Sequence, residues 1–316
     1  MKRFFCLIAA ALLMFAATAA LAAQPVAISI SQIVEHPALD NARKGFMDGL
    51  KELGVDAQFN VHIAQGNQAT NLQIANQILD EKPALVLAIA TPSAQACAQK
   101  IKDIPLLFSA VSDPKGAGLV SSMEAPGGHI TGTTDMPPVE KQLELIKKIL
   151  PKAATIGVVY NAGEANSVSQ VEAFKAAAKA MNINVVEATA TNSSLVYQAA
   201  QSLVGKCDAV YVPLDNTVVS ALASVVKVCD ENKLPLFSSD NESVGKGAIA
   251  ALATDYYALG KQTAEMAKKI LDGAKPGALP VERLKSPDVH VNLTAAKLQG
   301  VTVPEDVIKT AKKIYQ

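Results

Sequence analysis

Residues 26–54 read VAISISQIVEHPALDNARKGFMDGLKELG, and this stretch sets a pattern that the rest of the chain repeats. Its opening run, Val26–Ile30, is apolar and rich in β-branched residues, which is typical of a strand buried on both faces. A polar corner follows, and Pro37 suits the first turn of a helix because its missing N–H needs no partner there. Apolar residues then recur three and four positions apart until Gly54, a residue that commonly ends helices. The stretch therefore predicts a strand, a corner and a helix.

The same pattern returns in the second half of the chain, beginning with the apolar run Thr155–Tyr160. Further matched segments follow in the same order, and the best pair is IPLLFS at 104–109 and LPLFSS at 234–239. Strands that alternate with short helical segments form parallel sheets with right-handed crossovers. The sequence therefore predicts the α/β class, with two similar doubly wound parallel-sheet lobes joined by a hinge.

The segments outside the repeat predict where the lobes begin and end. The Gly- and Pro-rich stretch 125–138 suits a crossing between lobes, and 139–150 reads as the first helix of the second lobe. The C-terminal stretch 294–316 has no counterpart in the repeat, and we expect it to cross back between the lobes. Several crossings would make a hinge that closes over a ligand. The predicted first lobe comprises residues 23–134 and about 255–285, and the predicted second lobe comprises residues 135–254 and about 286–316.

The N-terminal stretch Met1–Ala22 has the three parts of an export signal. Two basic residues, Lys2 and Arg3, precede a long apolar run that ends in the small-x-small triplet Ala20-Leu21-Ala22. The alternative is an uncleaved membrane anchor, but the run is short for a span. No cysteine directly follows the triplet, so lipid attachment is not expected. We therefore expect cleavage after Ala22 and a product in the periplasm or another extracytoplasmic space.

The composition argues against several classes of function. Without Lys2 and Arg3 the formal net charge moves from 0 to −2, and no basic arm suggests nucleic acid. The remaining cysteines are Cys97, Cys207 and Cys229, with no CxxC pair, and the four histidines are scattered, so neither a metal site nor a cofactor is expected. Buried free thiols are the default, with a Cys207–Cys229 disulfide as the alternative.

Polar corners form the candidate ligand site, because open parallel sheets bind ligands at the carboxyl ends of their strands. Each of these residues could equally be a helix cap or part of a turn. A site is indicated because many such polar residues gather on one edge of two facing lobes. The candidate ligand-binding residues are Gln32, Glu35, His36, Thr91, Ser93, Ser109, Asp113, Tyr160, Asn161, Asp215, Asn216 and Asp240.

Some of these residues suggest specific roles. Thr91 is the expected N-cap of a helix, and its hydroxyl, that of Ser93 and the free N–H groups of the first turn favour an anion such as a carboxylate. Asp215 starts the matching helix of the other lobe, where it either caps that helix or accepts a ligand ammonium. Glu35, Asp113 and Asp240 are rivals for the second role. Tyr160 would supply a flat apolar face, and His36 would line the same space.

Enzyme activity has little support in the sequence. The chain contains no GxGxxG after the first strand, no GxxxxGK[ST] phosphate loop and no GxSxG nucleophile elbow. A two-lobed enzyme of the racemase or hydrolase kind would need facing catalytic groups such as paired thiols. Cys97 and Cys207 lie away from the predicted corners, which disfavours that alternative. We therefore expect a binding protein rather than an enzyme.

Several stretches resemble the tryptophan/tyrosine-type ABC transporter substrate-binding proteins. They are QIVEHPALD (32–40), ATPSAQA (90–96), FSAVSDP (108–114), GTTD (132–135) and VNLTAAKLQGVTVP (291–304), and the resemblance covers nearly all of residues 25–316. It implies a type I periplasmic binding fold and, as partners, a membrane ABC permease with its cytoplasmic ATPase. It also implies a small-molecule cargo, an aromatic or other apolar amino acid. We also expect a monomer.

Two alternatives share these features. One is a ligand sensor of the same fold that serves a signalling partner, and the other is a receptor for a nucleoside or a sugar. Sugar rings often stack on Trp in two-lobed receptors. This chain has no Trp, which argues against a sugar ligand.

Overall fold

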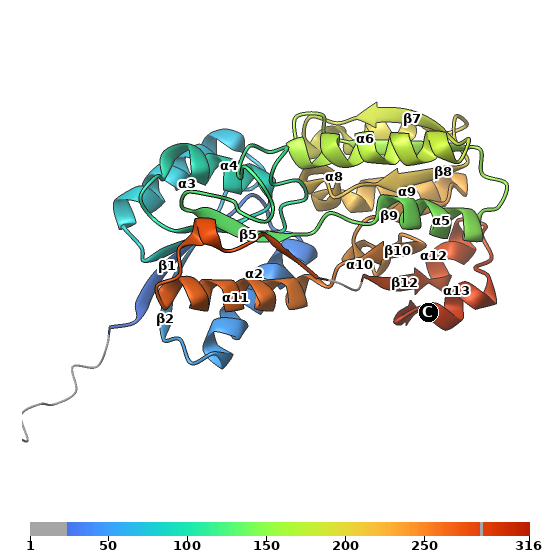
Figure 1. Cartoon of the computed structure of the whole chain (residues 1–316). Helices are drawn as coiled ribbons and strands as arrows, with labels where there is room; N and C mark the ends of the chain where they lie inside the picture. Colours follow the sequence, from blue (N-terminus) through green and yellow to red (C-terminus); the bar gives the residue numbers. More distant parts are fainter. Residues whose placement is uncertain (1–23, 285–286) are drawn as a thin grey trace, which may run out of the picture.

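The computed structural model describes residues 24–284 and 287–316, and it contains two lobes that are each built on one sheet (Figure 1). In the described residues the strand order is β11-β5-β4-β3-β1-β2 in the first sheet and β13-β12-β10-β9-β8-β6-β7 in the second. The predicted α/β fold with two similar parallel-sheet lobes is confirmed. The expected export signal lies outside the described residues. Among the described helices, none has the length and apolar character needed to cross a bilayer.

The first lobe has a wholly parallel sheet with helices on both faces. Its strands are β1 (Val26–Gln32), β2 (Ala57–Ile63), β3 (Leu85–Ile89), β4 (Leu106–Ser109), β5 (Ile130–Thr134) and β11 (Glu282–Arg283). Its helices are α2 (Pro37–Glu52), α3 (Gln68–Glu81), α4 (Thr91–Lys100), α11 (Tyr256–Leu271) and the short 3₁₀ helix η2 (Pro276–Ala278).

The second lobe repeats this plan with one antiparallel pairing, between β10 and β12. Its strands are β6 (Thr155–Tyr160), β7 (Asn184–Thr189), β8 (Ala209–Val212), β9 (Leu236–Ser238), β10 (Ala250–Ala253), β12 (Asp288–Asn292) and β13 (Lys313–Tyr315). Its helices are α5 (Val139–Ile149), α6 (Ala165–Ala180), η1 (Ser193–Leu195), α7 (Val196–Gln201), α8 (Asn216–Ser220), α9 (Leu222–Asn232), α10 (Asn241–Val244), α12 (Leu293–Leu298) and α13 (Glu305–Thr310).

Two expectations about the connecting segments are wrong. The stretch 125–138 is not simply a crossing, because residues 130–134 form the buried strand β5. Gly132 allows this strand to lie close to β4, since a Cβ there would be 2.1 Å from the carbonyl oxygen of Phe108. The C-terminal stretch 294–316 does not cross back between the lobes. It stays on the second lobe, where β13 pairs with β12 and Val307 is buried in the core.

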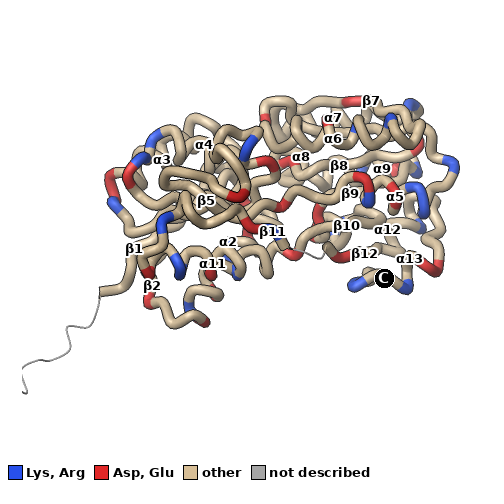
Figure 2. Tube along the Cα trace, in the orientation of Figure 1, with Lys and Arg blue, Asp and Glu red and all other residues tan. Residues whose placement is uncertain are grey.

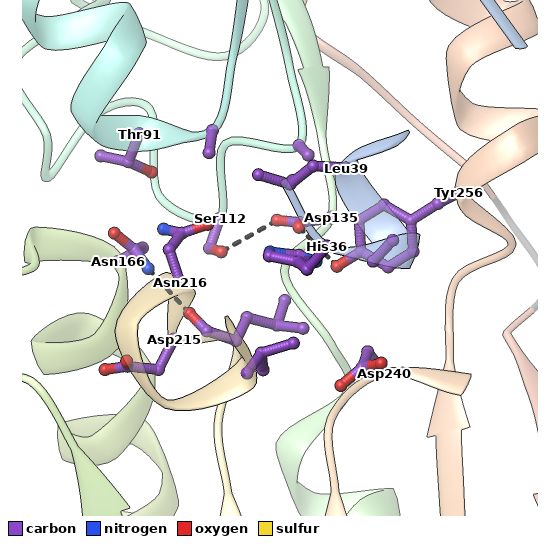
Figure 3. Close-up of a pocket in the computed structure, with 15 residues that line it drawn as sticks. His36, Leu39, Thr91, Ser112, Asp135, Asn166, Asp215, Asn216, Asp240 and Tyr256 are labelled. Carbon is purple, nitrogen blue, oxygen red and sulfur yellow. Dashed lines mark hydrogen bonds between the residues drawn. The ribbon is translucent and has the colours of Figure 1, made fainter. Parts of the chain in front are cut away.

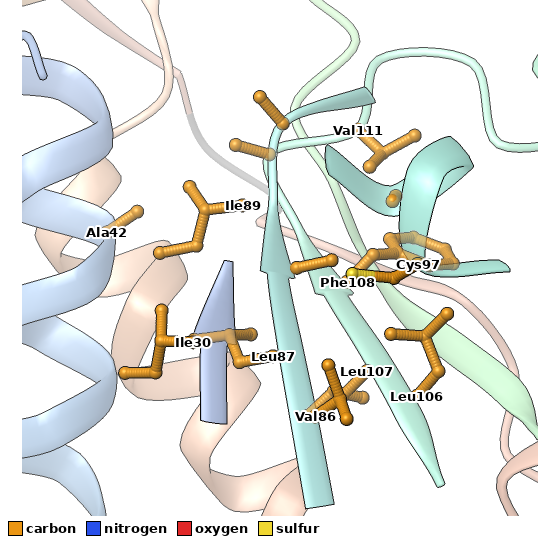
Figure 4. Close-up of a cluster of buried hydrophobic side chains, with 14 of the residues drawn as sticks. Ile30, Ala42, Val86, Leu87, Ile89, Cys97, Leu106, Leu107, Phe108 and Val111 are labelled. Carbon is orange, nitrogen blue, oxygen red and sulfur yellow. The ribbon is translucent and has the colours of Figure 1, made fainter. Parts of the chain in front are cut away.

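The core of the first lobe lies between its central strands and the helices that cover them (Figure 4). Ile30, Leu87 and Phe108 come from three neighbouring strands and are fully buried. Burial of each such side chain stabilises the fold by about 1.5–3 kcal/mol. All five residues of β3 are buried, as expected for a strand with a helix layer on both faces.

Helices α2 and α11 pack against each other at unusually short range in the first lobe. A Cβ built on Gly260 would lie 2.1 Å from the carbonyl oxygen of Ala42, and one built on Gly45 would lie 2.1 Å from that of Tyr257. Glycine at both positions therefore lets the two backbones come into contact. This packing fixes the start of α11, from which Tyr256 reaches the space between the lobes.

In the part of the chain that the structure describes, consecutive strands belong to different sheets after β5, after β10 and after β11. Asp135 follows β5 directly, and Tyr256 is the first residue of α11, just after β10. The Tyr256 hydroxyl donates to Asp135 Oδ2 at 2.8 Å, which ties the first crossing to the second. These two residues also line the cavity described below.

Acidic and basic residues are interspersed over both lobes, without one extended basic face in the view of Figure 2. The three cysteines of the described residues are free thiols, with Cys97 and Cys229 buried and Cys207 half-buried.

Candidate functional site

A small cavity lies between the lobes (Figure 3). Its empty volume of about 340 Å³ includes space that is open to solvent. Residues of both lobes and of the crossings line it: His36, Ala38, Leu39, Ala90, Thr91, Ala110, Ser112, Asp135, Asn166, Leu214, Asp215, Asn216, Val219, Asp240 and Tyr256.

Asp135 is a buried carboxylate on the first-lobe side of the cavity. It accepts hydrogen bonds from Ser112 Oγ at 2.9 Å and from the Tyr256 hydroxyl at 2.8 Å. Burial raises the pKa of its carboxyl, although both hydrogen bonds act in the opposite direction. A ligand cation near this carboxylate would stabilise its charged form, which burial separates from water.

The start of α4 faces the cavity without a side-chain cap. Ala90 occupies the N-cap position with a φ of 74°, a conformation that is strained for a residue with a Cβ. Thr91, predicted as the N-cap, is instead the first helical residue. Its side chain is 1 % exposed, and among the described residues its Oγ1 has no hydrogen-bond partner. Free N–H groups and an unpaired hydroxyl at a helix start form a site for an anion.

Asp215 caps α8 on the second-lobe side of the cavity. Its Oδ1 accepts from the backbone N–H of Val218 at 2.7 Å, and its Oδ2 accepts from that of Asn161 at 2.6 Å. Burial, followed by the nearby Glu164 carboxylate, raises the pKa of Asp215 to about 7. Asp215 is thus a helix cap that also faces the cavity.

Asp240 and His36 complete the polar lining. Asp240 caps α10 by accepting from the N–H of Ser243 at 2.7 Å, and burial raises the pKa of its carboxyl. Burial lowers the pKa of His36 to about 4, so its imidazole is neutral at pH 7. His36 comes from the first lobe and Asn216 from the second, and both line the cavity.

The lining therefore has two chemically different ends. Three buried carboxylates and no Lys or Arg are found among the described residues that line the cavity, which favours a ligand cation. The α4 start with Thr91 favours an anion. The remaining wall is mainly apolar and comes from Ala38, Leu39, Leu214, Val219 and the Tyr256 ring. Such a lining suits a zwitterion with an apolar side chain.

Tyr160 does not line the cavity. Its ring lies in the core of the second lobe, and its hydroxyl donates to Glu187 Oε2 on the neighbouring strand at 2.6 Å. The hydrogen bond to Glu187, followed by burial, raises the pKa of Tyr160 to about 12. Successive side chains of a strand point to opposite faces, and Tyr160 points to the face away from the ligand cavity.

Three other candidates are buried near the cavity but serve the scaffold. The Gln32 amide donates to the carbonyl of Val34 and to Asp40, both at 2.8 Å, and so shapes the corner before His36. Ser93 Oγ donates to Asn71 Oδ1 at 3.2 Å. Ser109 Oγ lies 3.0 Å from Thr263 Oγ1, within a hydroxyl cluster under α11.

Three more candidates lie at the edges of the interface between the lobes. Glu35 and Asn161 line a larger polar groove that meets the cavity at Asn216. Asp113 accepts a hydrogen bond from Ser169 Oγ of the second lobe at 2.8 Å. The structure thus brings five predicted residues to the cavity itself: His36, Thr91, Asp215, Asn216 and Asp240.

Several lining residues were not predicted as contacts. Three of them, Ser112, Asn166 and Leu214, follow the carboxyl ends of β4, β6 and β8, which is the edge where parallel sheets bind ligands, so their region was predictable. Asp135 ends the stretch GTTD, which signalled only the family resemblance. Tyr256 had no signal, because it is placed by the packing of α11 on α2.

The comparisons with known proteins agree with one another. A family model for the ABC transporter substrate binding protein matches residues 27–315. A tyrosine-binding protein of Clostridioides difficile is 45% identical over 269 residues, which cover 84% of this chain and 78% of the relative.

Two solved structures resemble the chain throughout. One is an ABC domain of Streptococcus pneumoniae in complex with L-Trp, with 35% identity, a TM-score of 0.89 and coverage of 92% of this chain and 100% of that one. The other is the ligand-free, open form of a substrate-binding protein with adhesive properties from Clostridium difficile. It has 42% identity, a TM-score of 0.70 and coverage of 92% and 99%.

Proposed function

Because the chain belongs to the family of ABC transporter substrate-binding proteins, we propose that it binds an aromatic α-amino acid in the cavity between its lobes. In this proposal the protein works outside the cytoplasm as a monomer. It delivers the amino acid to a membrane permease that a cytoplasmic ATPase drives.

The observation that carries the proposal is the charge pattern of the cavity. An α-amino acid presents a carboxylate and an ammonium on one carbon atom. The α4 start with Thr91 supplies donors for the carboxylate, and Asp135 supplies an acceptor for the ammonium. Neutral sugars and nucleosides carry neither charge, and they would leave the carboxylates of the cavity buried without a counter-charge.

The aromatic cargo is supported by two relatives and by the cavity wall. One relative is a tyrosine-binding protein, and the other was solved with L-Trp. In this chain the wall around Leu39, Leu214 and Val219 offers apolar contacts to a ring, and the Tyr256 ring adds an aromatic face. The relatives differ in ligand, so the proposal names the class of aromatic amino acids.

Hinge closure over the ligand is supported by the arrangement of the lobes. The structure has a higher TM-score with the L-Trp complex than with the open form, 0.89 against 0.70, although the open form has the higher sequence identity. A rigid-body difference between lobes lowers a TM-score without lowering identity. Asp135 and Tyr256 lie at two crossings between the lobes, so a ligand there would act directly on the proposed hinge.

Thermal unfolding of the protein with the twenty amino acids, several sugars and nucleosides tests the function. A ligand at a hundred times its dissociation constant adds about 2.7 kcal/mol of stability. We expect a clear rise in Tm with tyrosine, tryptophan or both, and little with the sugars or nucleosides. A rise with sugars or nucleosides alone would keep the fold and overturn the proposed cargo.

Ser169→Ala is expected to weaken ligand binding by loosening the closed arrangement. Ser169 Oγ donates to Asp113 Oδ2 across the lobe interface, outside the cavity lining. A hydrogen bond to a charged group contributes about 1.5–3 kcal/mol, and partial solvent exposure lowers this, so we expect a loss of about fivefold in affinity. Calorimetric titration measures the loss, and small-angle scattering measures the population of the compact form.

The matched control is Ser202→Ala, which removes a serine hydroxyl that bonds only within the second lobe, to the carbonyl of Ala199 at 2.7 Å. Its affinity should equal that of the unmodified protein. Equal affinities of the Ser169→Ala and Ser202→Ala variants would show that the Ser169–Asp113 contact does not support closure.

A further inference from the structure

Glu164 is a buried carboxylate that lies outside the ligand cavity and holds the start of α8. Its Oε2 accepts from the backbone N–H of Asn216 at 3.1 Å and from the Asn216 amide at 2.5 Å. Its Oε1 accepts from the N–H of Thr217 at 3.0 Å and from the Thr217 hydroxyl at 2.8 Å. Glu164 itself is 4 % exposed and stands at the N-cap of α6, whose own first turn it does not cap through its side chain.

The same carboxylate also reaches a second residue of the cavity lining. The Asn166 amide donates to Glu164 Oε2 at 3.3 Å and to the carbonyl of Leu214 at 2.7 Å. Asn166, Leu214 and Asn216 all line the cavity (Figure 3). One side chain therefore connects the α6 start to two amides and a corner that face the ligand space.

Glu164 also determines which end of the Asn216 amide faces the cavity. Because the amide nitrogen donates to Glu164, the amide oxygen is left for other partners. The opposite orientation would place the amide oxygen against the Glu164 carboxylate, which can only accept.

We infer that Glu164 is a positioning residue of the ligand site, which fixes the orientation of Asn166 and Asn216 through three of its five hydrogen bonds and does not touch the ligand. This inference rests on the proposed function. Its carboxylate has two oxygens that act only as acceptors, and every group facing it in these bonds is a donor. Glutamine has one accepting oxygen and an NH₂ group that would face donors.

The negative charge of Glu164 also affects the pKa of Asp215, and this effect can be measured separately from its hydrogen bonds. Glu164 is one of two causes that raise the pKa of Asp215, after burial. The titratable groups near Asp215 are Glu164 at the start of α6 and the other ionisable residues that line the cavity, which are His36, Asp135, Asp240 and Tyr256. His36 is neutral near pH 7, so among these groups the carboxylates determine the charge near Asp215.

The test is Glu164→Gln, with affinity for tyrosine and tryptophan measured by calorimetric titration from pH 5 to 9. In the unmodified protein, affinity should rise with pH through about 7, because Asp215 loses its proton and adds negative charge to the cavity in which Asp135 holds the ligand ammonium. In Glu164→Gln we expect affinity to fall about tenfold or more and the midpoint of this rise to move to lower pH. A purely structural defect would lower affinity equally at every pH without moving the midpoint.

Two further variants serve as a control and as a second test. Glu172 lies on the same helix and pairs with Lys175. Glu172→Gln removes this exposed carboxylate, so it should leave affinity and the pH midpoint unchanged. Thr217→Val removes one donor to Glu164 without altering the cavity lining, and it should lower affinity by about threefold. The Thr217→Val variant tests the role of Glu164 if the Glu164→Gln variant does not fold.

The outcomes separate the two proposals. If the unmodified protein binds no aromatic amino acid, the proposed function fails first. If it binds one and Glu164→Gln binds it equally well with the same pH midpoint, the positioning role of Glu164 is wrong and the proposed function stands. Unchanged affinity in Thr217→Val, with Glu164→Gln unfolded, would also overturn the role.

Discussion

Asp135→Asn is expected to weaken the binding of an aromatic amino acid by about 100-fold. Asp135 is buried, lines the cavity and is the proposed acceptor for the ligand ammonium. A hydrogen bond between two charged groups contributes more than one between neutral groups, and leaving a buried ammonium without its counter-charge adds a further cost. A 100-fold loss corresponds to about 2.7 kcal/mol.

The substitution keeps the volume of the side chain, so the effect should appear in affinity rather than in folding. The asparagine oxygen still accepts from one of the two hydroxyls, Ser112 or Tyr256, and the other hydroxyl is free to rotate. Calorimetric titration gives the affinity, and denaturant unfolding checks that the variant is folded.

Asp208→Asn is the matched control for this experiment. Asp208 accepts from the backbone N–H groups of Ala154 and Thr155 at 2.8 and 2.9 Å, and it lies outside the cavity. The Asp208→Asn variant should bind the ligand as tightly as the unmodified protein. If Asp135→Asn also retains an affinity within threefold of the unmodified protein, Asp135 does not hold the ammonium.

Gly260→Ala is expected to destabilise the fold by about 2–3 kcal/mol, the opposite sign from helix propensity. Alanine in a helix interior is more favourable than glycine by about 1 kcal/mol. At Gly260, however, the added Cβ would lie 2.1 Å from the carbonyl oxygen of Ala42 and 2.8 Å from the backbone nitrogen of Phe46. These contacts are with backbone, so α2 and α11 must move apart, and overpacking of this kind costs about 1–3 kcal/mol or more.

Denaturant unfolding measures this effect, with Glu265→Ala as the control. Glu265 lies on the same helix and is exposed, so its replacement should change stability by less than about 0.5 kcal/mol. A Gly260→Ala variant as stable as the unmodified protein would mean that α2 and α11 are not in backbone contact.

Much of the fold is predictable from the sequence because parallel strands covered on both faces are continuous apolar runs. Val26–Ile30 and the run around Leu85–Ile89 have this property, and the repetition in the second half doubles the signal. Strand β5 escaped prediction because ITGTT has a single large apolar residue, Ile130, and its Gly and Thr residues also suit loops. The C-terminal tail escaped because its pairing, β13 on β12, involves partners that have no equivalent in the repeat.

The region of the site was predictable, but the direction of its side chains was not. The rule that ligands bind at the carboxyl ends of parallel strands selected His36, Thr91 and Asp215, and the structure places all three in the lining of the cavity. The same rule also selected Tyr160, which points away because a strand presents alternate residues to opposite faces. Asp135 is a different case, since it gains its place from a crossing between lobes rather than from a corner before a helix.

The central claim is that the cavity recognises both charged groups of an aromatic amino acid. Calorimetric titration with L-tyrosine, with tyramine, which lacks the carboxylate, and with 3-(4-hydroxyphenyl)propionate, which lacks the ammonium, tests it most directly; L-tryptophan with tryptamine and indole-3-propionate forms the parallel set. We expect at least one of the two amino acids to bind, and each of its analogues to bind about 100-fold more weakly or worse. An analogue that binds as tightly as its parent amino acid would show that the cavity does not recognise both charged groups.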